Sequence, residues 1–364
     1  MEQMKARLKE LCGLTGISAR EDEVVRYMKE NLSRYSKQVT VDMLGNVTAY
    51  FPCGKEDAKK ILFFGHMDEV GLIVKKVEEN GYLRLERLSA VNSHIIPGSV
   101  WNVRTHDGKL IPGVVGAMSH HFMKAEDKAK VPELSQLALD IGCRSKEEVN
   151  ALGISEGCVT SFMPQFIELA NNMVSTKSVD DRAACAVLLG LAEYAASHPL
   201  SFDLYIIASV QEEFNIRGIM PAARAVDPDI AIGIDVTPAG DSPDLAGVSD
   251  IRLGGGPAFT YLNYHGRGTL NGLIPNEPLV HGLEDACRRG GIPFQREVCR
   301  GLLTETCYIQ ISGNKGVATA GISIPIRYAH TPVEVVSVDD LIYTEKLLEA
   351  FCSGWDDSLN LYKA

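Results

Sequence analysis

Positive charge is scarce in this sequence, which has 36 lysines and arginines against 47 aspartates and glutamates. The formal net charge of -11 opposes attraction to phosphate backbones and anionic lipid surfaces. We therefore expect neither a nucleic acid nor a membrane as a partner. No apolar run approaches the ~18 residues of a membrane-spanning helix, and the first residues indicate an amphipathic helix rather than a signal peptide. We expect a cytoplasmic protein.

Cysteine motifs are absent as well. The nine cysteines are scattered and never arranged as Cys-x-x-Cys. This spacing argues against a disulfide framework and against a thiolate zinc site. We expect reduced thiols, most of them buried.

The composition that remains is that of a globular protein, 45% hydrophobic and 23% charged, long enough for about two domains of ~150 residues. Near the N-terminus, Ser18-Ala19-Arg20-Glu21 has the pattern of a capping box and predicts the start of a helix. Alternation over residues 38–51 predicts a hairpin that turns at Leu44-Gly45-Asn46. The apolar run from Lys60 to Gly65 predicts a strand buried on both faces.

After residue 165, apolar helices and strands alternate. The predicted helices cover residues 183–198, 217–226, 278–290 and 338–354, and the predicted strands cover residues 203–210, 230–236 and 321–327. Strands that are apolar throughout are typical of a parallel sheet with helices on both faces. We therefore predict an α/β fold with a mainly parallel, doubly covered sheet.

Between these parts the pattern changes to short β-like segments. They are separated by the turn signals Asn80-Gly81, Pro97-Gly98 and Asp107-Gly108. We predict a small β-rich domain at residues 70–165, inserted into a discontinuous α/β domain formed by residues 1–69 and 166–364.

Two adjacent carboxylates, Asp180 and Asp181, precede the helix predicted at residues 183–198. Neighbouring acids repel each other unless a cation compensates their charge. The alternative is an ordinary helix N-terminus, where the helix dipole favours acids and aspartate is a good cap.

Polar side chains also follow other predicted strands. His66 and Asp68 follow the first apolar strand, and a carboxylate beside a histidine can fix its tautomer for metal binding. Glu212 and Glu213 follow the strand predicted at residues 203–210. Taken alone, the first pair could be a polar turn, and the second a solvated charge pair at a helix start.

Asp235 and His330 complete this pattern, since each follows an apolar strand. Alone, Asp235 could cap a turn and His330 could be a satisfied core histidine. Because the carboxyl ends of parallel strands meet at one edge of a sheet, we expect all these side chains to converge there. Two histidines with several carboxylates suit two divalent ions that share a carboxylate.

The same segments closely resemble the glutamyl/TET aminopeptidase family of co-catalytic metallopeptidases, in order and over nearly the whole chain. The matching segments are Gly65-His66-Met67-Asp68-Glu69-Val70-Gly71, Val179-Asp180-Asp181-Arg182, Val210-Gln211-Glu212-Glu213, Arg217-Gly218, Asp235 and Ile324-Pro325-Ile326-Arg327-Tyr328-Ala329-His330-Thr331-Pro332. The resemblance implies a zinc-aminopeptidase-like fold that removes N-terminal residues from short peptides.

The resemblance also implies two divalent metal ions per subunit, zinc or cobalt, with manganese as a further candidate. Asp180 would bridge the ions, with His66 and Asp235 completing one metal site and Glu213 and His330 completing the other.

Two further roles follow from the resemblance. Glu212 would be the general base that accepts a proton from the attacking water, and Asp68 would be the partner of His66. The peptide bond between Asp180 and Asp181 would be cis.

The inserted domain would serve dimerisation, within a homo-oligomer that could extend to a tetrahedral dodecamer. Two segments depart from the family pattern, Thr304-Glu305-Thr306 and residues 89–97, so the preferred N-terminal side chain stays open. The alternatives are a related dinuclear amidase or deacylase and a catalytically silent oligomeric scaffold. A glycosidase built on Glu212 and a second acid would leave His66, Asp180 and His330 without a role.

Overall fold

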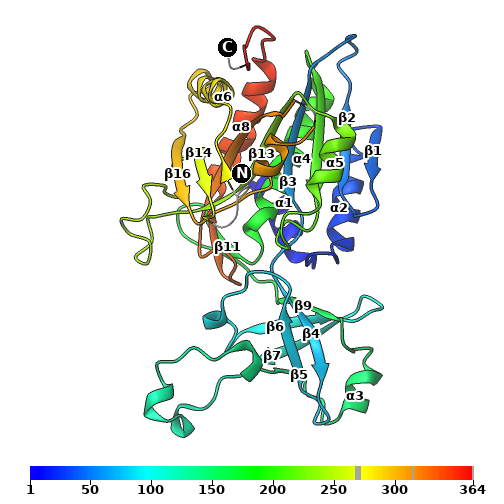
Figure 1. Ribbon diagram of the computed structural model, residues 1–364, viewed down its shortest axis with the longest axis vertical. Coiled ribbons are helices and arrows are strands. Elements are labelled where there is room, and N and C mark those ends of the chain that lie inside the picture. The colour runs from blue at the N-terminus through cyan, green and yellow to red at the C-terminus, as the bar shows by residue number, and fades with distance from the viewer. Residues whose placement is uncertain (267–271, 314, 363–364) are drawn as a thin grey trace.

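A mixed β-sheet forms the core of the upper part of the molecule in Figure 1. The structure is a computed structural model that describes residues 1–266, 272–313 and 315–362. Within these residues the main path of the sheet runs β1-β2-β12-β3-β13-β17-β18-β11-β10, and β14 joins it at β17 together with β15 and β16. The strands are β1 Gln38–Val41, β2 Val47–Phe51, β3 Lys60–His66, β10 Phe166–Glu168, β11 Met173–Thr176, β12 Asp203–Ser209, β13 Ile230–Pro238, β14 Ala258–Tyr264, β15 Gly272–Leu273, β16 Gln295–Arg300, β17 Ala318–Arg327 and β18 Glu334–Ser337.

The middle of this sheet is parallel. Strands β12, β3, β13 and β17 pair in parallel, as the apolar runs predict. The pairs on the flanks are antiparallel. They are β1–β2, β2–β12, β17–β18 and β11–β18. The prediction of a mainly parallel sheet is therefore wrong for the flanks. Short connections explain the antiparallel pairs β1–β2 and β17–β18, whereas β2–β12 and β11–β18 join strands far apart in the chain.

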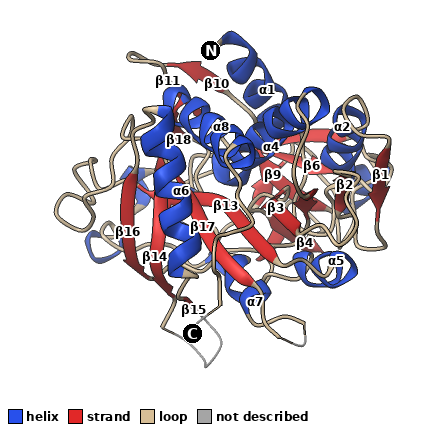
Figure 2. Ribbon diagram, turned by 90° about the horizontal axis from the view of Figure 1, so that it is seen from above, coloured by secondary structure: helices blue, strands red, loops and turns tan. Residues whose placement is uncertain are grey.

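Helices lie on either side of the central strands (Figure 2). Helices α4 and α8 pack on one side, with α1 against α4 and α6 against α8, while α5 and α7 pack on the other. The bounds are α1 Glu2–Gly13, α2 Asp22–Leu32, α4 Val179–Ser197, α5 Ile219–Val226, α6 Glu277–Gly290, α7 Thr306–Gln310 and α8 Val338–Ser353. Side chains of β3 alternate between the two cores, Ile61 and Phe63 in one, Leu62 and Phe64 in the other. No helix of the described residues is long and apolar enough to cross a bilayer.

A closed β-barrel lies below the sheet in Figure 1 and has its own hydrophobic core. Its strands are β4 Leu72–Val77, β5 Leu83–Arg87, β6 Val100–Arg104, β7 Leu110–Val115, β8 Leu139–Asp140 and β9 Val159–Phe162, with helix α3 Lys146–Ala151 beside them. The core includes Trp101 packed on Phe162, with ring centroids 4.0 Å apart. The barrel strands all fall between the predicted boundaries at residues 70 and 165.

The capping box predicted at Ser18 does not form. Helix α2 begins at Asp22, and the Ser18 hydroxyl instead donates to Oδ2 of Asp68 at 2.6 Å. The Glu21 carboxylate accepts from the backbone N–H groups of Ala19 and Gln211. Both side chains are used in contacts with distant segments, which a local pattern does not reveal.

Candidate active site

The predicted site residues lie at the carboxyl ends of the central strands. β3 ends at His66, and the parallel register places Ser209, the last residue of β12, beside it. On the other side, β13 pairs with β3 as far as Gly233 and carries Asp235 further along the same strand. Glu212 follows β12, and His330 follows β17. The structure thus brings residues from several strands to one edge, together with Asp180 at the start of α4.

Asp180 is the centre of this group. Its Oδ1 lies 3.1 Å from Nε2 of His66, and its Oδ2 lies 3.1 Å from Nε2 of His330. The same His330 nitrogen lies 3.1 Å from Oε1 of Glu213. One carboxylate therefore faces two histidines with its two oxygens.

The donor atoms form sets that could each hold a metal ion. Within each set one donor atom per residue lies within 4.8 Å of the others, and the sets are His66 with Asp180 and Asp235, Asp180 with Glu213 and His330, and His66 with Glu212 and Glu213. Imidazole nitrogens and carboxylate oxygens are donors that suit zinc and related divalent ions. The residues present therefore fit two cations that share Asp180.

Both histidines are oriented through their second ring nitrogen. Nδ1 of His66 lies 3.3 Å from Oδ1 of Asp68 and 3.2 Å from its backbone oxygen. Nδ1 of His330 lies 3.1 Å from the carbonyl oxygen of Ala90, in the segment that joins β5 to β6 of the barrel. A proton on each Nδ1 leaves Nε2 as the free donor that a metal requires.

Asp68 also holds the segment after β12. Its carboxylate accepts hydrogen bonds from the backbone N–H groups of Glu212 at 2.9 Å and Glu213 at 3.1 Å. With the hydroxyl of Ser18 and the ring of His66, these contacts make Asp68 a link between three segments. The role beside His66 that the sequence predicts is thus only part of its set of contacts.

The turns that carry the site residues have unusual backbone conformations. Ser178, Gln211 and His330 have φ angles of 60°, 58° and 62°, in the left-handed region that side-chain-bearing residues seldom adopt. Left-handed φ angles at residues with side chains concentrate at functional sites. The bond between Asp180 and Asp181 is cis, as the resemblance implies.

Negative charge is concentrated here. Burial raises the pKa of Glu212 well above its ordinary value, and the charges of Asp235 and Glu213 raise it further. Burial raises the pKa of Asp235 to about 7. Burial alone would lower the pKa of His330, but the charge of Glu213 and the contacts with Asp180 raise it to about 12. Such crowding of acids calls for compensating cations.

A buried ionic cluster that no local sequence pattern predicts lies behind the site. Nζ of Lys177 lies 2.6 Å from Oε2 of Glu69, and Nη2 of Arg182 lies 3.7 Å from Oε1. Glu69 also accepts from the backbone N–H of Gly16 at 2.9 Å and from the hydroxyl of Ser178. These contacts connect the end of β3 to the start of α4. The sequence offers one signal for them, since Glu69 and Arg182 both lie inside segments that resemble the aminopeptidase family.

Glu305, in one of the segments that depart from the family pattern, is also buried near the site. Its Oε2 accepts from the Ser209 hydroxyl at 2.7 Å, and its Oε1 has no hydrogen-bond partner among the described residues. Burial raises the pKa of Glu305 to about 8. It belongs to the floor of the site, and no local pattern in the sequence indicates that position.

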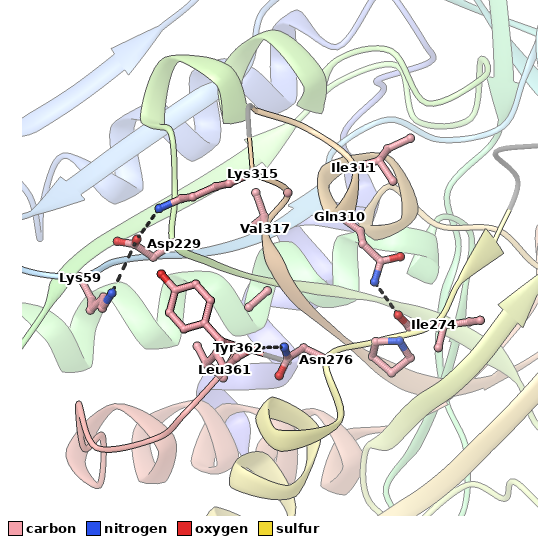
Figure 3. A pocket seen from close by; sticks show the side chains of 13 residues that line it. Lys59, Asp229, Ile274, Asn276, Gln310, Ile311, Lys315, Val317, Leu361 and Tyr362 are labelled. Atoms are coloured by element: carbon pink, nitrogen blue, oxygen red, sulfur yellow. Dashed lines mark hydrogen bonds and ion pairs between the residues drawn. The ribbon is translucent and has the colours of Figure 1, made fainter. Parts of the chain in front are cut away.

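A pocket at the opposite edge of the sheet has a volume of about 550 Å³ (Figure 3). It lies where β3, β13 and β17 begin, and two lysines, Lys59 and Lys315, flank Asp229 there at 3.9 and 3.4 Å. Because none of the clustered donors lines this pocket, we place the chemistry at the other edge.

The sequence profile described as M42 glutamyl aminopeptidase matches residues 45–347. The chain belongs to the M42 glutamyl aminopeptidase family. Among curated relatives of this M42 family member, the Escherichia coli (strain K12) protein named "Putative aminopeptidase SgcX" is 44% identical over 335 residues, which cover 92% of this chain and 89% of that protein.

Solved structures show the same fold. The aminopeptidase APDkam598 from the archaeon Desulfurococcus kamchatkensis superposes with a TM-score of 0.90 at 35% identity, covering 97% of this chain and 95% of that one. The TET1 peptidase of Pyrococcus horikoshii, described as assembling into a tetrahedron or a large octahedral shell, has a TM-score of 0.84 at 28% identity, with 96% and 99% covered. This M42 family member is an aminopeptidase, a peptide hydrolase that acts as an exopeptidase.

Proposed function

We propose that this aminopeptidase uses two divalent metal ions to remove N-terminal residues from short peptides, with Glu212 as the general base. The observation that carries the proposal is the position of Asp180, whose two carboxylate oxygens each lie 3.1 Å from a different histidine. A carboxylate in this position is suited to bridge two cations.

In this proposal the two ions share Asp180. His66 and Asp235 complete one metal site, and Glu213 and His330 complete the other, in agreement with two of the donor sets. When bound, the ions would supply Lewis acidity and lower the pKa of a water molecule between them. The nitrogen and oxygen donors favour zinc or cobalt, with manganese as a further candidate.

Glu212 performs the proton transfer. Its carboxylate lies with His66 and Glu213 in the third donor set, next to the proposed position of the water. Glu212 accepts a proton from the attacking water and returns it to the nitrogen of the leaving peptide. Asp68 holds the backbone of Glu212 at 2.9 Å, which keeps the base in place while its carboxylate exchanges the proton.

We propose that residues 70–165, which contain the barrel, form a separate domain that mediates dimerisation. Support comes from the apolar side chains that it exposes to solvent, which include Met118 and Phe122. A larger homo-oligomer, up to a tetrahedral dodecamer, would follow the description of the P. horikoshii TET1 peptidase. Light scattering after size exclusion would measure the assembly. A monomer at micromolar concentration would contradict this part of the proposal.

A cytoplasmic location stays a prediction.

The test of the catalytic proposal uses chelator-treated protein reconstituted with zinc, cobalt or manganese. Aminoacyl-p-nitroanilides should be hydrolysed only after metal is restored, and the same substrates with an acetylated amino group should not. Hydrolysis of the blocked substrates at a similar rate would favour a dinuclear amidase or deacylase. Full activity after complete metal removal would refute the metal-dependent mechanism, and metal binding without turnover of any substrate would favour a silent scaffold.

A further inference from the structure

Like Asp68, the buried carboxylate of Glu334 accepts hydrogen bonds from the backbones of two proposed site residues. Glu334 is the first residue of β18 and is 1% exposed. Its Oε2 accepts a hydrogen bond from the backbone N–H of Asp180 at 3.1 Å, and its Oε1 accepts one from the backbone N–H of His330 at 2.7 Å. A single carboxylate thus connects the shared ligand with a ligand of one ion.

The position of β18 in the sheet explains this geometry. β18 pairs with β11 on one side, where Glu334 lies opposite Thr176, and with β17 on the other. β11 leads into the turn that carries Asp180, and β17 leads into the turn that carries His330. Glu334 therefore lies between the two segments whose spacing matters.

A carboxylate as buried as that of Glu334 should lower the stability of the fold, which suggests that it has a positioning role. Among the described residues, both hydrogen bonds found for its carboxylate come from neutral main-chain groups. Burial and the like charge of Asp180 disfavour its ionised form more than the charge of His330 favours it. A buried carboxylate that accepts no hydrogen bond from a cationic side chain is destabilising relative to a neutral residue of similar shape. Both donors, however, belong to proposed metal ligands.

The same arrangement recurs on the other side of the site. The Asp68 carboxylate accepts from the backbone N–H groups of Glu212 and Glu213, again with one oxygen for each. The turn held by Glu334 also needs support, because His330 has a φ of 62°, which is unfavourable for a residue with a side chain.

We infer that Glu334 is a positioning residue that sets the spacing between Asp180 and His330, and thereby the affinity for the ion that these residues hold with Glu213. This inference rests on the proposed function, because it concerns the residues proposed to hold the ions. The ion at Asp180, Glu213 and His330 should depend on Glu334 most, since two of its three ligands are attached to this carboxylate. Contacts that orient metal ligands are typically worth about 10- to 100-fold in metal affinity.

Two substitutions test the inference. Glu334→Gln replaces one acceptor oxygen with an amino group that would face an N–H donor. Glu334→Asp keeps the charge but is one methylene too short to reach both N–H groups. The matched control is Glu284→Gln on α6, another buried glutamate, which bonds to Tyr261, Arg288 and Arg296.

The measurement is a titration of Co²⁺ into the metal-free proteins, followed by the visible absorption of the bound cobalt and by competition with a chelator. Circular dichroism verifies that each variant is folded. In wild type we expect two ions to bind. In each folded Glu334 variant we expect one of the two to bind about 10- to 100-fold more weakly, with altered absorption bands. Glu284→Gln should bind both ions as wild type does.

The outcomes separate the inference from the function on which it rests. If wild type binds no metal at these residues, the proposed function fails. If wild type binds two ions and the folded Glu334 variants bind them with unchanged affinity and absorption, the inference alone is overturned. Equal weakening in Glu284→Gln would also overturn it, because the effect would then follow general destabilisation.

Discussion

Nε2 of His66 lies 3.1 Å from Oδ1 of Asp180, although 114 positions separate the two residues in the chain. The end of β3 and the start of α4 therefore meet at one point, and the second oxygen of Asp180 extends the contact to His330. The predictions on metal binding and catalysis depend on this convergence.

Removing a proposed ligand should deplete metal. We expect His66→Ala or Asp235→Ala to retain about one ion per subunit at metal concentrations that saturate both sites in wild type, because each loses one of three ligands for the same ion. Elemental analysis after gel filtration would measure the occupancy. His281→Ala, an exposed histidine on α6, is the matched control and should keep wild-type occupancy. Two ions per subunit in both ligand variants would contradict the assignment.

Removing the proposed base should leave metal in place. Glu212→Gln keeps the shape of the side chain but cannot accept a proton, and we expect kcat to fall by about 10²- to 10⁴-fold. Metal content should stay at the wild-type level, which separates this variant from the ligand variants. A Glu212→Gln enzyme with most of its activity would require another general base.

Metal binding should release protons and weaken as the pH falls. In the metal-free protein the pKa of His330 is raised to about 12 and that of Asp235 to about 7, so His330 is protonated at neutral pH and Asp235 partly so. Both must lose the proton to bind a cation. Calorimetry in buffers of different ionisation enthalpy would count the protons released. His330→Ala should release fewer, and a count independent of this substitution would contradict the expectation.

A buried carboxylate away from the site provides a test of stability against pH. Hydrogen bonds from Arg296, despite burial, lower the pKa of Glu284 to about 2. Its stabilising contribution should therefore be complete above its unfolded-state pKa of ~4.3 and be lost as the pH falls through about 2. Denaturant unfolding should show Glu284→Gln to be about 1–3 kcal/mol less stable at pH 7, with a smaller difference at pH 3.

The control for this experiment is its neighbour Asp285, which is exposed and contacts only Arg288 among the described residues. Asp285→Asn should change the free energy of unfolding by less than about 0.5 kcal/mol at either pH. A pH-independent loss in Glu284→Gln would show that packing, rather than charge, supplies the stability.

The buried cluster behind the site should be essential for folding stability. Glu69→Gln leaves the ammonium of Lys177 buried without its carboxylate partner, so we expect a loss of about 3–5 kcal/mol in the free energy of unfolding. Glu86→Gln removes an exposed partner of Lys75 and should cost less than about 0.5 kcal/mol. Similar losses in the two variants would show that burial does not determine the strength of these pairs.

Local patterns predicted the elements whose residues alternate or repeat regularly. The apolar run at residues 60–65 is β3, and the helix predicted at residues 183–198 is part of α4. The sequence did not predict β14, β16 or β18, because their residues are apolar on only part of their length. Their partners also include strands that are not adjacent in the chain, β16 for β14 and β11 for β18. The residues after Ser18 fit the pattern of a helix cap, whereas the Ser18 hydroxyl donates to Asp68.

The candidate catalytic residues can be predicted from the amino-acid sequence, because acids and histidines that follow apolar strands are expected at the carboxyl edge of a parallel sheet. The side chains that hold these residues in place become apparent only in the folded molecule. No spacing along the chain predicts the contacts of Glu334, Glu69 and Glu305, since each has hydrogen-bond partners in segments far along the chain. The physical reason is that a hydrogen bond depends on the final distance between two atoms, and that distance is set by packing rather than by spacing along the chain.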